Sequence, residues 1–394
     1  MYICIMLLTR TAEKELRTLA GQFKAVAVVG PRQSGKTTLV RMAFPDKAYV
    51  SLENPDTRRF AIEDPRGFIA GYPDGAILDE IQRTPDIFSY LQQVLDENKG
   101  KGRFIITGSN NFLLQENISQ SLAGRVGYLY LLPLSINELP KHKLSVNEQI
   151  HKGFYPAMYE QEGQTDVSKY YLNYIRTYIE RDVRLIRNVT DLYTFERFLR
   201  LCAGRTGQLL NMNSLAVETG VDNKTIGAWL SVLEASFVVF RLQPYHKNYN
   251  KRIVKMPKLY FYDTGVASAL LGIENPDQLA LHPFRGGLFE NMIIVDFLKS
   301  RYNKGNPNNL YFWRDSLGTE IDLLVEKANS LLPIEIKSGQ TITDDYFKSM
   351  SAWLRISGME KGWVIYAGDE KQVRSNGITV LPLNEMERLL ASSS

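Results

Sequence analysis

Cysteine and histidine are scarce in this chain of 394 residues, which contains two cysteines and four histidines. Cys4 and Cys202 lie far apart in the sequence, so no disulfide framework is expected. The histidines and cysteines also lack the spacing of a zinc finger, which argues against a structural zinc site. The composition favours a protein of a reducing compartment.

Long apolar runs and a strong excess of one charge are also missing. The apolar stretch at residues 1–8 is too short to cross a bilayer, and it has neither a basic leader nor a small-residue cleavage site. We therefore expect a cytoplasmic protein with no membrane partner, whose natural start is Met1 or Met6. The formal net charge is only +4, so any contact with nucleic acid must come from a local basic patch.

A phosphate-binding loop is the most specific pattern in the chain. Residues 30–37 read GPRQSGKT and match G-x-x-x-x-G-K-[ST] at every fixed position. The apolar run 25–29 predicts a buried parallel strand before the loop, and residues 38–42 predict the first turns of a helix after it. Backbone N–H groups at such a junction cradle phosphates. The residues expected to bind the nucleotide are Gly30, Pro31, Arg32, Gln33, Ser34, Gly35, Lys36, Thr37 and Thr38.

A second motif supplies the other half of this predicted site. Residues 75–80 read GAILDE, an apolar strand that ends in two acids. Asp79 is expected to hold Mg²⁺ together with the Thr37 hydroxyl, while Lys36 reaches the β- and γ-phosphates. Glu80 is expected to orient or deprotonate the attacking water. The pattern therefore predicts hydrolysis of the nucleotide as well as binding.

The end of a third predicted strand, at residues 103–108, offers a polar side chain that could sense the γ-phosphate or the water. Ser109 and Asn110 both qualify; the sequence does not choose between them, and we take Asn110 as the candidate. A guanine-reading N-K-x-D segment is not found, because residues 223–226 lack the aspartate. We therefore expect ATP rather than GTP.

These motifs resemble those of the AAA-type ATPases of bacteria and archaea. The resemblance is strongest to the group that carries a C-terminal domain of unknown function with a nuclease-like fold. It extends over nearly the whole chain and is carried by the segments GPRQSGKTTL, AILDEIQ and FIITGSN and by residues 121–125, 133–135, 153–156, 178–183 and 257–265. It also implies a role for Arg125, since AAA-type chains often sense phosphate with an arginine placed after the third strand motif. Arg125 would act within its own chain or on a neighbouring subunit of an ATP-dependent homo-oligomer, and a plain salt bridge is the alternative.

The order of predicted elements divides the chain into four segments of an α/β protein. Residues 1–134 alternate strands with helices and predict the parallel sheet of a P-loop ATPase. Residues 135–200 turn helical and predict a lid over the nucleotide. Residues 201–260 predict a winged helix-turn-helix module, and residues 261–394 predict an α/β nuclease-like domain.

The third segment has the pattern of a DNA-binding module. Residues 213–221 predict a capped helix closed by Gly220, and residues 222–233 predict the helix that follows it. Lys224 and Thr225 begin this second helix, where contacts with bases are usual.

Two strand-like stretches come next, at 237–242 and 255–260, and they predict the arms of a β wing. No acid occurs between Glu234 and Asp263, whereas six Lys or Arg residues do. Such cations can neutralise DNA phosphates, and we expect this of Lys247, Lys251 and Arg252 in particular, together with Arg241, Lys255 and Lys258. The alternative is a module that contacts only the ATPase or a partner protein.

The fourth segment carries a second set of acids. Glu335 and Lys337 share one face of a predicted strand, and Asp322 lies in the preceding strand of a predicted hairpin. Asp322 and Glu335 can bind one divalent cation, Mg²⁺ or Mn²⁺, and Lys337 can orient the attacking water or stabilise the developing charge. Glu290, on a predicted helix, is a further ligand or contact.

This arrangement resembles the PD-(D/E)xK nuclease fold, with one departure, since Ile321 stands where that pattern has proline. The alternative is a nuclease fold kept as a scaffold, with its acids solvated or salt-bridged. The whole sequence thus predicts an ATPase that works on DNA and carries a metal-dependent nuclease-like domain. An ATP-dependent switch that binds DNA or a protein and cuts nothing is the alternative, and a translocase or helicase is a third reading. Cleavage needs Lys337, whereas the switch does not.

Overall fold

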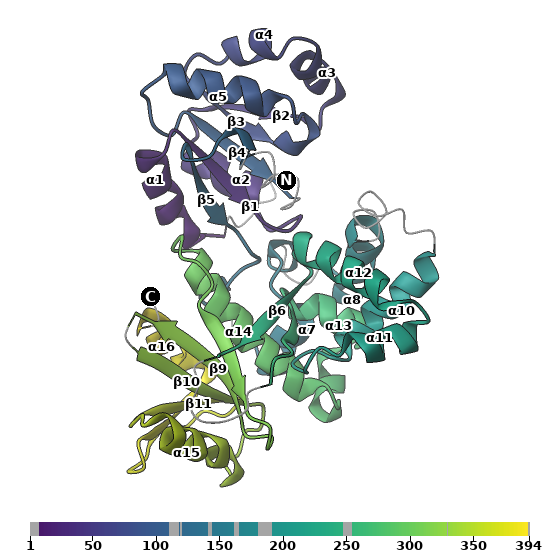
Figure 1. Ribbon diagram of the computed structural model, residues 1–394, viewed down its shortest axis with the longest axis vertical. Coiled ribbons are helices and arrows are strands. Elements are labelled where there is room, and N and C mark those ends of the chain that lie inside the picture. The colour runs from purple at the N-terminus through teal and green to yellow at the C-terminus, as the bar shows by residue number, and fades with distance from the viewer. Residues whose placement is uncertain are drawn as a thin grey trace, which may run out of the picture.

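The computed structural model describes residues 8–109, 118, 120–140, 144–160, 165–179, 191–246, 254–328 and 330–392 (Figure 1). Four predicted site residues, Asn110, Lys247, Lys251 and Arg252, lie outside this described part. None of the helices described is both long and apolar enough to cross a membrane.

The N-terminal part is built on a five-stranded parallel sheet in the order β2-β3-β4-β1-β5. Its strands are β1 (Ala25–Val29), β2 (Ala48–Ser51), β3 (Ala76–Asp79), β4 (Phe104–Gly108) and β5 (Val126–Tyr130). Strands β1, β3 and β4 are buried along their whole length, which explains their continuous apolar sequences. The predicted parallel α/β core is confirmed.

Helices cover both faces of this sheet. One face packs on α1 (Ala12–Gln22) and α2 (Lys36–Ala43), and the other packs on α4 (Pro65–Ala70) and α5 (Ile87–Glu97). The short helix α3 (Pro55–Glu63) precedes α4, with Asn54 capping its N-terminus. Because all five strands run in the same direction, their carboxyl ends meet at one edge, and the phosphate-binding loop lies there.

The middle of the chain is helical (Figure 1). Its helices are α7 (Val146–Lys152), α8 (Val167–Tyr174), which continues into a π-helical turn (Ile175–Ile179), α10 (Leu192–Ala203), α11 (Met212–Thr219), α12 (Asn223–Ala235) and α13 (Thr264–Leu270). The two helices predicted at 213–221 and 222–233 are present as α11 and α12, with Gly220 closing α11 in a left-handed conformation at φ 82°. Trp229 of α12 packs edge-on against Phe195 of α10, with ring centroids 5.2 Å apart.

A mixed eight-stranded sheet in the order β12-β13-β11-β10-β9-β8-β6-β7 forms the other large body. Its strands are β6 (Val239–Pro244), β7 (Lys258–Phe261), β8 (Leu310–Arg314), β9 (Glu320–Lys327), β10 (Ser330–Lys337), β11 (Gly362–Tyr366), β12 (Gln372–Val373) and β13 (Ile378–Pro382). Helix α15 (Asp345–Ser357) packs on one face, where Trp353 meets Trp313 with centroids 4.8 Å apart. Helix α14 (Arg285–Tyr302) packs on the other face, and α16 (Glu387–Ser392) closes the described chain.

The predicted β wing differs from what the structure contains. Strands β6 and β7 do pair antiparallel, but β6 also pairs in parallel with β8, so the hairpin forms the edge of the eight-stranded sheet. The apolar side chains of β7 are fully buried there, which a projecting wing would leave in water.

Helix α13, which the predicted boundary at residue 261 assigned to the nuclease-like domain, packs instead against the middle helices. Asp263 caps α13 and accepts a hydrogen bond from the Phe154 backbone N–H at 2.7 Å. Gly265 lies so close to the Tyr171 ring that a Cβ would come within 2.3 Å of it. This close approach fixes α13 beside α8.

Helix α14 joins the two sheets (Figure 1). Its Asp296 accepts a hydrogen bond from the Ile136 backbone N–H at 2.8 Å, and its Lys299 donates to the Leu134 carbonyl at 2.7 Å. Asn303, the residue that ends the helix, donates to the Thr11 hydroxyl at 2.7 Å. The C-terminal sheet is therefore attached, through α14, to the chain that leaves β5 of the N-terminal sheet.

Candidate functional site

The phosphate-binding loop lies between the end of β1 and the start of α2, as its sequence predicts. Gly30 is close to the backbone of Leu131, and a Cβ there would lie 2.1 Å from the Leu131 carbonyl oxygen. Gly35 adopts a left-handed conformation at φ 88° immediately before α2 begins. Only glycine meets both demands, so the two fixed glycines of the motif have local structural causes.

Lys36 is buried in the loop and folded back on it. Its Nζ donates hydrogen bonds to the carbonyl oxygens of Gly30 at 3.0 Å and Pro31 at 2.7 Å. Burial lowers the pKa of Lys36 to about 8, against the opposing attraction of Glu80 and Asp79. The ammonium thus pays a desolvation cost in the buried loop, and the charge of a bound phosphate would offset that cost.

Asp79 ends β3 and receives hydroxyl groups from three different elements. Thr37 donates at 3.2 Å and Tyr49, from β2, donates at 2.7 Å, while Thr107 of β4 also donates to this carboxylate. Hydroxyl and carboxylate oxygens are the ligands that Mg²⁺ prefers, so Thr37 and Asp79 fit the predicted metal role. Sequence reasoning missed Tyr49 and Thr107, which come from strands on either side of β3.

Glu80 follows Asp79 in a left-handed conformation at φ 55°, which is uncommon for a residue with a side chain. Its Oε2 accepts a hydrogen bond from the Ser109 hydroxyl at 3.1 Å and another from the Gln82 amide. Of the two residues considered as sensors, Ser109 is therefore brought to Glu80. Asn110 lies outside the described residues.

Two elements outside the motif hold the loop in place. Arg10 donates to the carbonyls of Ser34 and Leu132, both at 2.7 Å, and forms an ion pair with Glu138 at 3.3 Å. From α8, the Tyr170 hydroxyl donates to the Gln33 side chain at 2.5 Å. The predicted lid thus contacts the loop directly, although Arg10 carried no motif that could have revealed it.

A small, mostly apolar cavity opens beside the loop. Its lining comes from the chain before α1, from α2 and from the segment that follows β5, and includes Leu8, Gly35, Thr38, Met42, Leu134 and Pro156. It lies beside Thr38, the last residue of the predicted nucleotide-binding segment.

Arg125 lies away from this loop. It precedes β5, and because β5 runs parallel to β1, Arg125 is at the amino ends of the strands while the loop is at their carboxyl ends. Its guanidinium binds both carboxylate oxygens of Asp96, at 2.6 and 2.8 Å. A phosphate contact within the same chain does not fit this arrangement, and the role on a neighbouring subunit stays a prediction.

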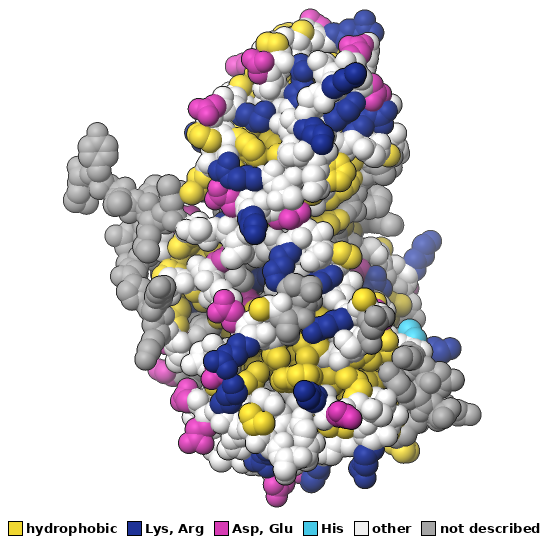
Figure 2. Space-filling view, turned by 90° about the vertical axis from the view of Figure 1, so that its left-hand side faces the viewer, with side chains coloured by type: hydrophobic (Ala, Val, Ile, Leu, Met, Phe, Trp, Pro, Cys, Tyr) yellow, Lys and Arg dark blue, Asp and Glu magenta, His cyan; other side chains and the backbone are white. Residues whose placement is uncertain are grey.

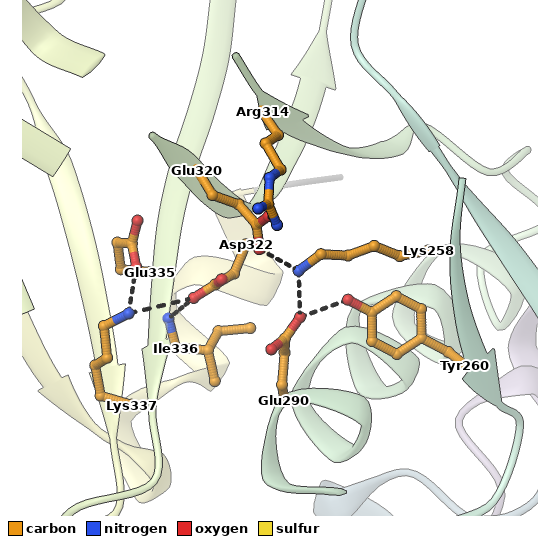
Figure 3. Close-up of polar contacts among 9 residues, drawn as sticks. All are labelled: Lys258, Tyr260, Glu290, Arg314, Glu320, Asp322, Glu335, Ile336 and Lys337. Atoms are coloured by element: carbon orange, nitrogen blue, oxygen red, sulfur yellow. Dashed lines mark hydrogen bonds and ion pairs between the residues drawn. The ribbon is translucent and has the colours of Figure 1, made fainter. Parts of the chain in front are cut away.

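The acids of the C-terminal sheet come together as the hairpin predicts (Figure 3). Strands β9 and β10 pair antiparallel and place Asp322 beside Glu335 and Lys337. Lys337 Nζ lies 2.6 Å from Glu335 Oε2 and 3.7 Å from Asp322 Oδ2. Asp322 Oδ2 also accepts the Ile336 backbone N–H at 2.8 Å, which fixes its orientation.

Glu290 reaches the same region from α14, but other groups already bind it. Lys258 Nζ lies 3.0 Å from Glu290 Oε1, and the Tyr260 hydroxyl donates to the same oxygen at 2.5 Å (Figure 3). Burial raises the pKa of Glu290 to about 7. Lys258 and Tyr260 lie on β7, and no sequence motif indicated that they would meet Glu290.

The acids do not form a preassembled set of three metal ligands. Across the ranges that the structure describes, no three or more His, Cys, Asp or Glu side chains are grouped so as to hold a metal ion. The expected trio of Glu290, Asp322 and Glu335 is therefore not assembled, because Lys258 and Tyr260 hold Glu290. Glu335 Oε1 is buried without a hydrogen-bond partner, however, and burial beside Asp322 raises the pKa of Glu335 well above its usual value. The chemistry of Asp322 and Glu335, two carboxylates side by side, thus fits a divalent cation.

The expected DNA contacts are only partly exposed. Lys224 is exposed, whereas the Thr225 hydroxyl donates to Asp222 at 2.9 Å as part of the cap of α12. Of the other expected cations, Arg241 is paired with Glu234 at 2.6 Å. Lys258 is buried at 2% exposure, so the expectation that it neutralises a DNA phosphate is wrong. On the face shown in Figure 2, Lys and Arg side chains are spread along the molecule and mixed with acids instead of gathering in one patch.

Comparison with known families divides the chain into three parts. Residues 22–140 match the model of an AAA domain, residues 143–277 match a domain of unknown function (DUF8612), and residues 285–386 match a second domain of unknown function (DUF4143). The middle match runs across residues 200 and 260, where we predicted boundaries. An AAA-type P-loop domain is thereby confirmed, together with an α/β fold that has a separate C-terminal α/β domain.

The chain is also similar to individual proteins along most of its length. The uncharacterized protein Rv2008c of Mycobacterium tuberculosis is 30% identical over 387 residues, which cover 97% of this chain and 85% of that protein. The uncharacterized protein MJ1544 of Methanocaldococcus jannaschii is 22% identical, covering 81% and 75%. Among solved structures, the Walker-type ATPase paby2304 of Pyrococcus abyssi is similar with a TM-score of 0.42 and 14% identity, covering 67% of this chain and 96% of that one.

Proposed function

Because this chain belongs to the same family as the uncharacterized protein Rv2008c of Mycobacterium tuberculosis and contains an AAA domain, we propose that it is a magnesium-dependent ATPase that acts on DNA through a metal-dependent nuclease-like domain. The observation that carries the ATPase part is the meeting of Thr37, Asp79 and Glu80 at the phosphate loop, with Ser109 bound to Glu80. We place the protein in the cytoplasm.

At the nucleotide site each group of the chain has a distinct task. Lys36 leaves the carbonyls of Gly30 and Pro31 and pairs with the phosphates. Thr37 and Asp79 would hold Mg²⁺, which would neutralise phosphate charge. Glu80 accepts the proton of the attacking water, and Ser109 keeps its carboxylate pointed at that water.

Two substitutions test this assignment. Lys36→Ala should abolish ATP binding measured by calorimetry, since the loop loses its positive charge. Glu80→Gln should leave binding within about twofold and reduce hydrolysis by at least about 100-fold, in the range that general bases contribute. Glu97→Gln, on the last turn of α5, is the matched control and should hydrolyse ATP at the wild-type rate. Wild-type turnover by Glu80→Gln would remove Glu80 from the mechanism.

The C-terminal site supports phosphodiester hydrolysis by its donor set. Asp322 and Glu335 would hold the cation, and Lys337 would stabilise the negative charge that develops on the phosphate. DNA would reach this site along the helix-turn-helix, with Lys224 and Thr225 at the start of α12 and with Lys247, Lys251 and Arg252. The test is an assay of plasmid and branched DNA with Mg²⁺ or Mn²⁺, with and without ATP.

Lys337→Ala should abolish cleavage and leave ATP hydrolysis unchanged, since the two sites lie on different sheets. Lys327→Ala, at the half-buried last residue of β9, is the control and should cut DNA normally. If the wild-type protein cuts none of these DNA forms with either metal, the nuclease part is wrong.

A second function, an ATP-dependent switch without cleavage, is favoured by one observation. Carboxylates of the C-terminal site are paired with Lys258 and Lys337. Such pairing would suit a scaffold that transmits the nucleotide state to a bound DNA or protein. It predicts that Lys337→Ala keeps every function of the wild type. A translocase or helicase reading would in addition require ATP-dependent movement along DNA.

A further inference from the structure

Lys258 is the most deeply enclosed cation of the C-terminal site. Its side chain is 3% exposed, and its ammonium lies between two carboxylates, 3.0 Å from Glu290 and 2.5 Å from Glu320. It also stands over the Phe312 ring at 5.6 Å from the centroid. A buried ammonium is stable only where such partners replace its water, so this position is built for a cation.

The surroundings of the two carboxylates complete this enclosure (Figure 3). The Tyr260 hydroxyl donates to the Glu290 oxygen that Lys258 also binds, and Arg314 pairs with the second oxygen of Glu320 at 3.0 Å. Lys258 lies on β7, Glu290 on α14 and Glu320 on β9, so three elements converge on the ammonium. Lys258, Glu290 and Glu320 each have partners of opposite charge, so this half of the acidic site needs no further ion.

The other half of the site is different. Asp322 and Glu335 share Lys337. Glu335 is only 1% exposed, and its Oε1 has no hydrogen-bond partner. A buried carboxylate oxygen without a donor is costly, and a divalent cation would satisfy it. The acidic site therefore has two positions for a cation. The one between Glu290 and Glu320 is filled by the Lys258 ammonium, and the one at Asp322 and Glu335 leaves a carboxylate oxygen without a partner.

We propose that the Lys258 ammonium is a built-in cation that permanently occupies the position between Glu290 and Glu320, so that the acidic site binds one divalent cation, at Asp322 and Glu335, instead of two. The inference rests on the proposed function in so far as that function assigns a metal to Asp322 and Glu335. Two-metal sites clamp both the attacking and the leaving oxygen with metal ions. Here Lys258 fills the second position with a single charge.

The experiment counts bound Mn²⁺ by electron paramagnetic resonance in the full-length protein without nucleotide. All variants carry Asp79→Asn, so that the ATPase site does not contribute. The protein with Asp79→Asn alone, called the background protein, should bind one Mn²⁺ per chain. Adding Asp322→Asn should leave none bound. Lys258→Met, which keeps the apolar stem and removes the charge, should bind two. Lys255→Met, at an exposed lysine three residues earlier, is the control and should bind one.

A second variant covers the case in which Lys258→Met does not fold without metal. Glu290→Gln keeps Lys258 and should still bind one Mn²⁺ with unchanged affinity, because Glu290 is not a metal ligand here. Loss of that ion, or an affinity at least tenfold weaker, overturns the inference. Folding of Lys258→Met only when Mn²⁺ is added supports it.

The remaining outcomes separate this inference from the proposed function. Two ions in the background protein, or one ion in both the background protein and Lys258→Met, overturns the role of Lys258 and leaves the metal at Asp322 intact. No ion in the background protein but one in Lys258→Met refutes the metal at Asp322 and still supports the built-in cation. No ion in either protein overturns both.

Discussion

Replacing Lys36 by methionine should make the nucleotide-free protein more stable while it abolishes ATP binding. The pKa of Lys36 lies at about 8 instead of 10.5, and burial is the main cause. A tenfold change in proton affinity corresponds to about 1.4 kcal/mol, so the charged ammonium costs the folded state about 3 kcal/mol at neutral pH. Methionine removes this cost but leaves two carbonyls, those of Gly30 and Pro31, without a donor, at about 1 kcal/mol for each. The net gain should be about 1 kcal/mol.

The dependence on pH distinguishes this cause from a general packing effect. Below pH 8 the lysine is protonated in both the folded and the unfolded chain, so its full cost is present. Between about pH 8 and 10.5 the unfolded chain binds more protons than the folded one, and the wild type gains stability as the pH rises. The advantage of Lys36→Met should therefore shrink steadily over that range.

Urea unfolding of both proteins at pH 7 and at pH 9.5 measures the effect, followed through signals of the N-terminal sheet. Lys14→Met, at an exposed lysine of α1, is the control and should change stability by less than about 0.5 kcal/mol. A Lys36→Met protein that is less stable than the wild type at pH 7, or whose advantage does not change with pH, would refute the reasoning.

Three further predictions can be tested. Gly30→Ala should lose ATP binding in calorimetry, because its Cβ would lie 2.1 Å from the Leu131 carbonyl oxygen; tight binding would show that the loop can move away. Reversing the charges of Lys247, Lys251 and Arg252 together should weaken DNA binding, measured by anisotropy. The slope of log affinity against log salt concentration should become shallower by about three, and an unchanged slope would place the DNA surface elsewhere. Arg125→Ala should prevent ATP-dependent assembly in light scattering, and a wild type that stays monomeric with ATP and Mg²⁺ removes the role on a neighbouring subunit.

The parts of the fold that the sequence predicts are those whose cause is local. Residues 25–42 contain the buried strand, the glycines and the helix start in one continuous stretch, so the geometry around Lys36 follows from neighbours in the chain. The hairpin that joins Asp322 to Glu335 is likewise made by two adjacent strands. Alternation of side chains along a strand is enough to place Glu335 and Lys337 on one face.

The parts that escaped prediction depend on distant pairings. Strand β6 pairs with β8 across about seventy residues, and no periodicity in either segment encodes this partner. Lys258 therefore looked like an exposed cation among others, whereas its strand is buried beside Glu290. Arg125 shows the same limit, because the order of motifs along a chain does not tell at which end of a sheet a residue lies.

Helix α14 determines how this protein can be divided. Glu290 stands near its first turn, while Asp296 and Lys299 lie about 9 and 14 Å further along the axis and bind backbone groups that follow β5. A fragment that starts at residue 285 would keep these two buried charged groups and lose their partners, at a cost of roughly 1–3 kcal/mol for each. It would also lose strands β6 and β7, and with β7 the Lys258 side chain. A C-terminal fragment cut where the family match begins should therefore be destabilised. A mutation that destabilises the N-terminal sheet should also perturb the surroundings of Glu290.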